Sequence, residues 1–463
     1  MSEHKATSGS PPATGPIGAG QPDDLDLLLR ACIQCGLCLP YCATYRATGN
    51  EAWSPRGRLL LLGRFLAGEV DSAEPGYLEA FDRCLGCRAC ETSCPSGVPF
   101  VLFEHLKAEA FTRLDLQLPL PLPWLASRWR LRSLRWVSGW ARAVLSRWLG
   151  RDWRRRLARR GGRLQRWSRL LGSLPHAVSS DKALIRMLDG LQARNPGRVD
   201  GPATDSADPQ PASSGTKETA RDPHPGQAPA PRLVFFQGCA NHGLLPDSSR
   251  RLLALLRAAG CDIVTPGGQT CCGALARHGG APALADGQRE QNLRILAQQR
   301  ARWDYLVVEA AGCGQELMEY SEELATRIRD AVQLLAELPL PAPRRVALDV
   351  VYHDPCHAVH GQGIQAAPRR LLAAIPGLRL VEPEDPLVCC GSGGPYSLRY
   401  PELATLMGRR KAAALAATTA HCVVTSNPGC LGQIADGLAL GAPELPIIPL
   451  TDLIWYAHGG PDR

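Results

Sequence analysis

Eight cysteines stand in two runs with identical spacing, CIQCGLCLPYC from residue 32 and CLGCRACETSC from residue 84. Two residues separate the first three cysteines of each run, and three residues precede the fourth. Thiolates bind zinc, copper(I) and iron–sulfur clusters, but a zinc knuckle places two ligand pairs on either side of a longer loop. The observed spacing is that of bacterial two-cluster ferredoxins. The runs therefore predict two [4Fe–4S] clusters, with zinc or disulfides as the alternative.

In such ferredoxins the fourth cysteine of each run ligates the other cluster. The first predicted ligand set is Cys32, Cys35, Cys38 and Cys94, and the second is Cys84, Cys87, Cys90 and Cys42. Clusters exchange single electrons, and a pair of them typically accepts electrons from a flavin. Because no G-x-G-x-x-G motif follows a predicted strand and opens a helix, we expect the flavin on a partner subunit.

Eight of the other ten cysteines belong to an internal repeat. FFQGCANHG, QTCCGALARHGG and AAGCGQE recur as YHDPCHAVHG, LVCCGSGGPYSL and NPGCLGQI, at offsets of 117, 118 and 117 residues. Three pairs of matching motifs at nearly the same offset indicate that this half of the chain is an internal duplication. The motif cysteines are Cys239, Cys271, Cys272 and Cys313 in the first copy and Cys356, Cys389, Cys390 and Cys430 in the second. Four thiolates suffice by number for one cluster or another metal in each copy.

Neighbouring residues leave several interpretations open. Adjacent cysteines cannot easily bind one iron, so each pair is expected to reach different irons or to leave one thiol free. Three histidines surround Cys356, namely His353, His357 and His360. They would be metal ligands, proton carriers to a quinone, or ordinary loop histidines. Cys261 and Cys422 open predicted strands outside the motifs, and we expect them in the hydrophobic core.

Short apolar runs alternate with helical patterns in both copies. RLVFFQG, CDIVTP and YLVVEA are predicted strands of the first copy, and RVALDVVYH, LRLVEP and CVVTSN correspond to them in the second. This alternation predicts two tandem α/β modules with parallel-type sheets that are covered on both faces. The motif cysteines fall where strands end, which is the edge at which such folds place their sites.

The N-terminal cysteine region is predicted to be helical. In SPRGRLLLLGRFLAG, Ser54 is a suitable N-cap, Pro55 suits the first helical position and Gly68 can end the helix. This helix fills much of the gap between the two cysteine runs, which favours a helical two-cluster domain over the compact type. Arg56 and Arg58 would either raise the cluster potentials or lie on the surface as ordinary arginines.

The predicted divisions of the chain follow its composition. They are a disordered tail at 1–22, a helical ferredoxin domain with two [4Fe–4S] clusters at 23–112, an Arg/Trp-rich helical segment at 113–190, a flexible linker at 191–231, and two modules at 232–345 and 346–463. Residues 121–170 hold fifteen arginines, seven of the ten tryptophans and one acid. We expect this block either on lipid headgroups or against an acidic partner subunit; nucleic acid is not expected as a partner.

The N-terminus has no apolar segment of the signal-peptide type, and no stretch reaches about 18 uninterrupted apolar residues. Eighteen cysteines in such a chain indicate metal or redox chemistry rather than disulfides. We therefore expect a cytoplasmic protein with reduced thiols, peripheral on the inner face of the cytoplasmic membrane if the basic block binds lipid.

Six stretches together resemble a known family. They are ACIQCGLCLPYCATY, SPRGRLLLL, RCLGCRACETSCPSGV, HDPCHAVHGQG, CCGSGGPYSLRYPELA and NPGCLGQI. In this order they resemble the iron–sulfur subunits of glycolate oxidase. More broadly, they resemble the family with a two-cluster ferredoxin domain and duplicated CCG modules, which includes heterodisulfide reductase and the iron–sulfur subunits of lactate utilisation and anaerobic glycerol-3-phosphate dehydrogenase. The resemblance covers residues 28–112 and 232–455.

The resemblance implies a membrane-associated complex in which flavin subunits oxidise glycolate and this chain relays electrons to the respiratory quinone pool. The chain would then be an oxidoreductase subunit that is inactive alone, and no catalytic residue is assigned. The heterodisulfide reductase branch ends its motif with C-x-x-C, where this chain has Glu316 and Gln433. This departure counts against noncubane clusters. The alternative is a heterodisulfide-reductase-like thiol/disulfide or lactate-utilisation oxidoreductase subunit.

Overall fold

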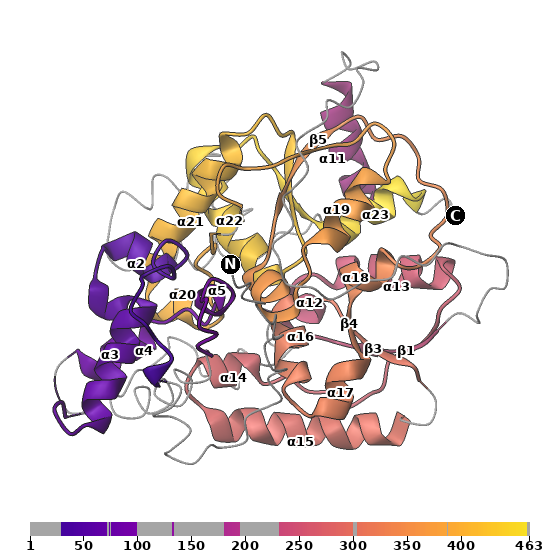
Figure 1. Ribbon diagram of the computed structural model, residues 1–463. Helices are drawn as coiled ribbons and strands as arrows, with labels where there is room; N and C mark the ends of the chain where they lie inside the picture. The colour runs from indigo at the N-terminus through magenta and orange to yellow at the C-terminus, as the bar shows by residue number, and fades with distance from the viewer. Residues whose placement is uncertain are drawn as a thin grey trace, which may run out of the picture.

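The computed structural model describes residues 29–71, 74, 76–99, 132–133, 180–194, 231–299, 303–386 and 388–460. The predicted tail, nearly all of the Arg/Trp-rich segment and most of the linker lie outside the described residues. Figure 1 shows the N-terminal domain in indigo beside two α/β modules. The predicted multidomain fold, with a helical N-terminal domain and two tandem modules, is confirmed.

The N-terminal domain contains only helices and turns where it is described. The helices are α2 (Ala43–Thr48), η1 (Glu51–Trp53), α3 (Pro55–Leu66), α4 (Tyr77–Asp82) and α5 (Ala89–Thr92). As predicted, Ser54 caps α3, because its hydroxyl accepts a hydrogen bond from the Gly57 N–H at 3.0 Å. Helices α3 and α4 pack through a small core that includes Leu62 and Phe81.

Each module contains a four-stranded, all-parallel sheet. The first, in the order β2-β1-β3-β4, consists of β1 (Arg232–Phe236), β2 (Asp262–Val264), β3 (Tyr305–Val308) and β4 (Ile328–Asp330). The second, in the order β6-β5-β7-β8, consists of β5 (Asp349–His353), β6 (Arg379–Val381), β7 (Cys422–Thr425) and β8 (Ile447–Pro449). The six predicted strands are present. The fourth strand of each sheet was not predicted.

Helices cover the sheets. Those of the first module are α12 (Cys239–Leu244), α13 (Pro246–Ala258), α14 (Ala274–His278), α15 (Pro282–Gln299), α16 (Ala311–Met318), α17 (Glu322–Arg327) and α18 (Ala331–Leu335). Those of the second are η3 (His357–Gly361), α19 (Ala366–Ala373), α20 (Tyr396–Arg399), α21 (Pro401–Ala416), α22 (Pro428–Gly441) and α23 (Leu450–Ala457). A further helix, α11 (Asp181–Ala193), packs against the modules through Leu184 and Leu188.

The two modules share one hydrophobic core. Phe235 of β1 and Tyr352 of β5, which are equivalent in the repeat, both lie in it, as do Cys261 and Cys422, the predicted core cysteines. The contacts between modules are reciprocal: α13 packs on α23, and α19, the counterpart of α13, packs on α18, the counterpart of α23. Figure 1 shows α13 and α18 next to α19 and α23. The modules therefore meet as the two halves of an isologous dimer do.

A buried ion pair crosses this shared core. Nη1 of Arg251, on α13, lies 2.7 Å from a carboxylate oxygen of Asp452, on α23, and both side chains are fully buried. Arg251 also contacts Asp181 of α11 at 3.0 Å. The guanidinium therefore joins three elements. Removing one partner of such a pair would leave a buried, uncompensated charge.

We predict that Arg251→Met lowers the free energy of unfolding by about 3–5 kcal/mol, because Asp452 loses its counter-charge. Anaerobic urea denaturation would measure this. The control is the double variant Arg251→Met/Asp452→Leu, which removes both charges and is expected to recover most of the loss. A single variant as stable as the parent chain would contradict the prediction.

Candidate functional site

A cavity in the N-terminal domain is lined by all four cysteines of the first predicted ligand set, Cys32, Cys35, Cys38 and Cys94. The loop around it takes positive φ angles at Gln34 (57°) and Gly36 (80°), so it curls tightly about the thiols. A Cβ on Gly36 would lie 2.8 Å from Nη1 of Arg56, so a side chain there would displace the Arg56 guanidinium.

A second cavity is lined by the other predicted set, Cys42, Cys84, Cys87 and Cys90. Its loop repeats the positive φ angles at Gly86 (70°) and Arg88 (61°). Cys90 lines both cavities, so the two sites adjoin. Burial raises the pKa of the Cys87 and Cys90 thiols well above the usual value. A soft metal offsets this cost, because a coordinating thiol is held deprotonated.

Arg58 places a positive charge beside the second cavity. Its side chain is buried, its Nε donates to the Ala80 carbonyl at 2.6 Å, and its Nη2 donates to Thr44 Oγ1 at 3.3 Å. The guanidinium lies next to the thiols of the second set. The surface interpretation is therefore wrong for Arg58, whereas Arg56 is partly exposed and pairs with Glu51.

The structure thus brings each predicted quartet together, with three cysteines from one run and one from the other. None of the eighteen cysteines forms a disulfide. The donor sets fit two [4Fe–4S] clusters in number and chemistry. The crossed ligation itself stays a prediction.

The first module gathers its motif cysteines at the carboxyl ends of β1, β2 and β3. The Sγ atoms of Cys239 and Cys271 are 3.5 Å apart, and the Cys272 thiol is close enough to hydrogen-bond with Cys271 and Cys313. All four are buried. The two adjacent cysteines thus contact different partners: Cys271 contacts Cys239, and Cys272 contacts Cys313.

The second module repeats this arrangement. The Cys389 thiol contacts Cys356 and Cys390, and Cys390 contacts Cys430. His353 ends β5 in this site and is buried. Burial, together with the nearby Lys411 ammonium, holds the pKa of His353 well below its usual range, so its imidazole is neutral.

The two positions that depart from the C-x-x-C motif have other contacts. The Glu316 carboxylate accepts a hydrogen bond from Nε of Arg277 at 2.8 Å. Nε2 of Gln433 donates to the Ala404 carbonyl at 2.6 Å and thereby joins α22 to α21. Both side chains are buried where they support packing.

The N-terminal domain meets both modules next to the second cavity. Nε2 of His357 lies 2.8 Å from the Gly86 carbonyl oxygen, and the His357 ring stacks on His278 of the first module at 5.5 Å. Nδ1 of His360 lies 2.7 Å from Thr92 Oγ1. These two histidines therefore sit at the junction of the three domains, which the sequence did not indicate.

The sulfur sites approach one another across this junction. The Cys87 thiol is near Cys356, and this proximity adds to burial in raising the pKa of Cys87. Helix η3, which Cys356 caps, packs on α16, which carries Cys313. Helix α12, which begins at Cys239, packs in turn on α22, which carries Cys430. The sulfurs thus form a series from the N-terminal domain into the second module, and helices that carry motif cysteines of the two modules pack on one another.

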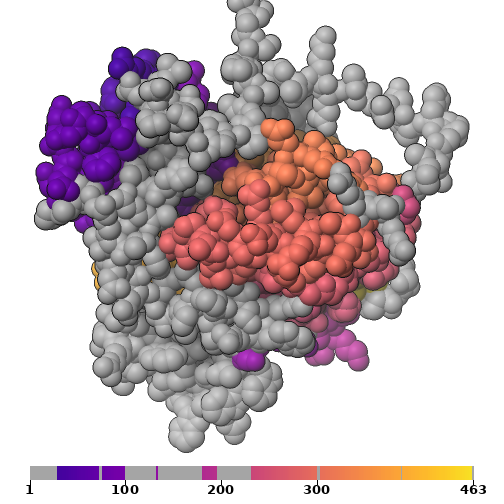
Figure 2. Space-filling model, turned by 90° about the horizontal axis from the view of Figure 1, so that it is seen from below, coloured from indigo at the N-terminus to yellow at the C-terminus, as the bar shows by residue number. Residues whose placement is uncertain are grey.

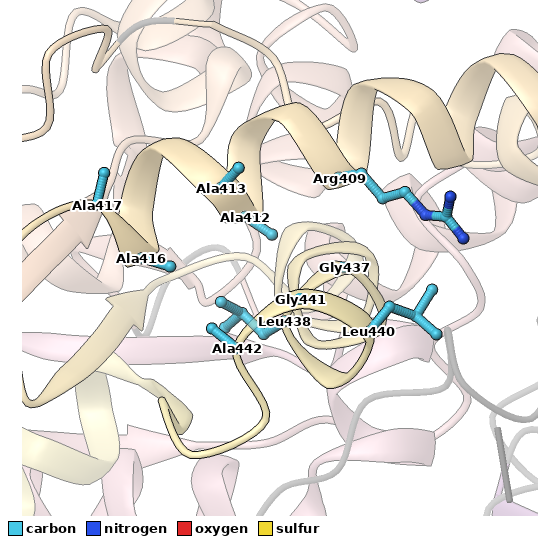
Figure 3. A pocket seen from close by; sticks show the side chains of 10 residues that line it. All are labelled: Arg409, Ala412, Ala413, Ala416, Ala417, Gly437, Leu438, Leu440, Gly441 and Ala442. Carbon is cyan, nitrogen blue, oxygen red and sulfur yellow. The ribbon is translucent and has the colours of Figure 1, made fainter. Parts of the chain in front are cut away.

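A different cavity, of about 750 Å³, lies between α21 and α22. Figure 3 shows the apolar side chains of Ala412, Ala416 and Leu438 that line it, with Arg409 at one end. Among the described residues that line it, there is no cysteine, histidine or carboxylate.

Comparisons with known proteins agree with these sites. Residues 28–98 match the 4Fe-4S dicluster domain, and residues 233–318 and 350–435 each match the cysteine-rich domain described as CCG. The probable glycolate oxidase iron-sulfur subunit of Bacillus subtilis is 30% identical, over 92% of this chain and 94% of that protein. The chain belongs to the glycolate oxidase iron–sulfur subunit family.

Other relatives agree with this assignment. The glycolate oxidase iron-sulfur subunit of Escherichia coli is 27% identical over 89% of this chain and 91% of that protein. A fumarate reductase (CoM/CoB) subunit of Methanothermobacter marburgensis is 33% identical over 50% of this chain and 48% of that protein. As a member of this family, the chain is an iron–sulfur electron-transfer subunit of an oxidoreductase complex. Among its described helices, none has the length and apolar character needed to cross a membrane.

Paired substitutions test the crossed ligation. If Cys32 and Cys94 bind one cluster, Cys32→Ser/Cys94→Ser loses about four irons per chain, whereas Cys32→Ser/Cys42→Ser loses about eight. Iron and sulfide analysis after anaerobic purification gives both numbers. If instead each run bound its own cluster, Cys32→Ser/Cys42→Ser would lose about four irons and Cys32→Ser/Cys94→Ser about eight. Cys261→Ala is the control, and it is expected to retain all iron because Cys261 lies in the shared core.

Proposed function

We propose that this chain relays single electrons within a glycolate oxidase complex, from a flavin on a partner subunit to the respiratory quinone pool. The observation that carries the proposal is the series of sulfur sites that runs through the N-terminal domain to the second module. Cys90 lines both cavities of the N-terminal domain, and Cys87 adjoins Cys356 of the second module. The iron–sulfur subunit names of the relatives support the same role.

In this proposal the eight cysteines of the N-terminal domain hold two [4Fe–4S] clusters, which supply one-electron redox chemistry when bound. Of these eight thiols, Cys42 is buried, Cys35 is exposed and the other six are partly exposed. Arg58 contributes positive charge beside the second set, which favours the more negative, reduced state. The potential of that site is therefore raised relative to one without a buried cation.

Electrons are proposed to enter at the first cysteine run. Three large apolar side chains there are exposed, Ile33 at 70%, Leu37 at 55% and Tyr41 at 46%. They belong to the same loop as Cys32, Cys35 and Cys38 of the first set, and Cys35 is itself exposed. Exposed apolar groups on a redox loop suit docking of a partner subunit. Figure 2 shows this domain in indigo at one edge of the molecule, beside the first module.

The experiment is anaerobic purification of the tagged chain from its native host, followed by glycolate-dependent reduction of a quinone analogue. We expect a flavoprotein to co-purify and glycolate to drive quinone reduction. A Cys94→Ser complex is the matched control: it is expected to reduce a dye that accepts electrons directly from the flavin, but not the quinone. A preparation without flavoprotein, inactive with glycolate, would contradict the proposal.

A second candidate is thiol/disulfide or lactate chemistry. The relative named as a fumarate reductase (CoM/CoB) subunit and several relatives named as lactate utilization proteins align with about half of this chain. The same preparation would be assayed with lactate and with disulfides. Turnover of a disulfide by the chain without a flavoprotein would support this candidate over the relay.

The buried arginine gives a further prediction. Arg58→Met is expected to lower the potential of one cluster by on the order of 100 mV, because an uncompensated buried charge a few ångströms away is removed. Redox titration followed by electron paramagnetic resonance would measure the shift. Arg56→Met is the matched control on the same helix, and its effect should be much smaller because Arg56 is partly exposed and paired with Glu51. Equal shifts would refute this role for Arg58.

A further inference from the structure

The second module contains a group of three side chains that the cysteine motif alone does not define. His353 ends β5, Cys390 lies in the loop after β6, and Cys430 lies in the first turn of α22. One ring nitrogen of His353 and the two Sγ atoms all lie within 4.8 Å of one another. Two ligands of one tetrahedral metal ion lie about 3.5–3.8 Å apart, so side-chain shifts of about 1 Å would complete such a site.

His353 has no other role in the described structure. Only 1% of the residue is exposed, and neither ring nitrogen has a hydrogen-bond partner there. His421, at the opposite end of β5, shows the usual pattern, since its Nδ1 accepts a hydrogen bond from the Asp349 N–H at 2.9 Å. A buried imidazole without partners is unfavourable, and a metal ion is the partner that a neutral imidazole beside two thiols suits best.

The duplication provides an internal comparison. At the repeat offset, Cys390 and Cys430 correspond to Cys272 and Cys313, but His353 corresponds to Phe236. Phe236 ends β1 as His353 ends β5, and its ring is buried in the apolar core of the first module. The cysteines are therefore common to both modules, whereas the imidazole is present in one.

We propose that His353, Cys390 and Cys430 bind iron or zinc in the second module, in a mixed nitrogen–sulfur site that the first module lacks. Two thiolates and an imidazole are the donors that these borderline-soft ions prefer. Three protein ligands leave one position of a tetrahedral ion for a further ligand.

Neighbouring groups would stabilise the negative charge of the two thiolates in this site. Nδ2 of Asn427 donates to the Cys430 Sγ at 3.4 Å. The buried Lys411 ammonium donates to the carbonyl oxygens of Asp385 and Pro386, at 3.0 and 2.8 Å, and lies near the Cys390 thiol. A hydrogen-bond donor and a fixed cation around the thiolates are typical of a metal site's surroundings.

The test compares the metal content of full-length chains purified anaerobically. His353→Phe, which copies the first module, is expected to lose at least one iron or zinc per chain. X-ray absorption at the edge of the metal that is lost should show a nitrogen ligand in the parent chain and none in the variant. The control His421→Gln should keep both the metal and the nitrogen signal.

A third variant separates ligand loss from misfolding. His353→Cys is expected to restore the metal through a thiolate but not the nitrogen signal. Unchanged metal in His353→Phe would overturn the site, and so would a loss in His353→Cys as large as that in His353→Phe. Since neither readout depends on glycolate, flavin or quinone, the result is independent of the proposed relay.

Discussion

The structure depends on bringing thiols out of water and balancing the charge that they carry once they bind metal. Buried thiolates are unfavourable unless cations, or N–H groups that donate hydrogen bonds to the sulfur, surround them. Arg58 lies beside the second N-terminal set, and Lys411 lies near Cys390. The left-handed backbone at Gly36 and Gly86 wraps the two loops around their sites. Helix packing and sheet topology serve mainly to hold these compensating groups in place.

The junction of the three domains follows from the same requirement. An electron relay needs its centres close together and rigidly spaced, so the segments between them must be fixed. His357 contacts the Gly86 carbonyl and stacks on His278, and Arg399 of α20 pairs with the buried Asp82 of α4. Each contact joins two of the three domains. The spacing between sites is therefore set by polar contacts as well as by packing.

Much of this architecture could be predicted from the sequence. Cysteine spacing defined the N-terminal quartets, and the repeat offset defined both modules. Strand β4 escaped prediction because only one of its three residues is apolar, and β8 because prolines flank its two isoleucines. The burial of Arg58 could not be foreseen, because tertiary packing covers it. Nor could the sequence separate His353 from His357, since only the fold turns one into the core and the other toward the N-terminal domain.

The reciprocal packing of the two modules has an evolutionary consequence. Equivalent faces of both sheets, marked by Phe235 and Tyr352, line one core. A single-module ancestor would have had to bury that face against a second copy of itself. Gene fusion made the association intramolecular and therefore independent of protein concentration. Fusion also allowed the sequences of the two modules to diverge, because in a homodimer every substitution is present in both copies. The contrast between Phe236 and His353 is a difference that only a fused pair can hold.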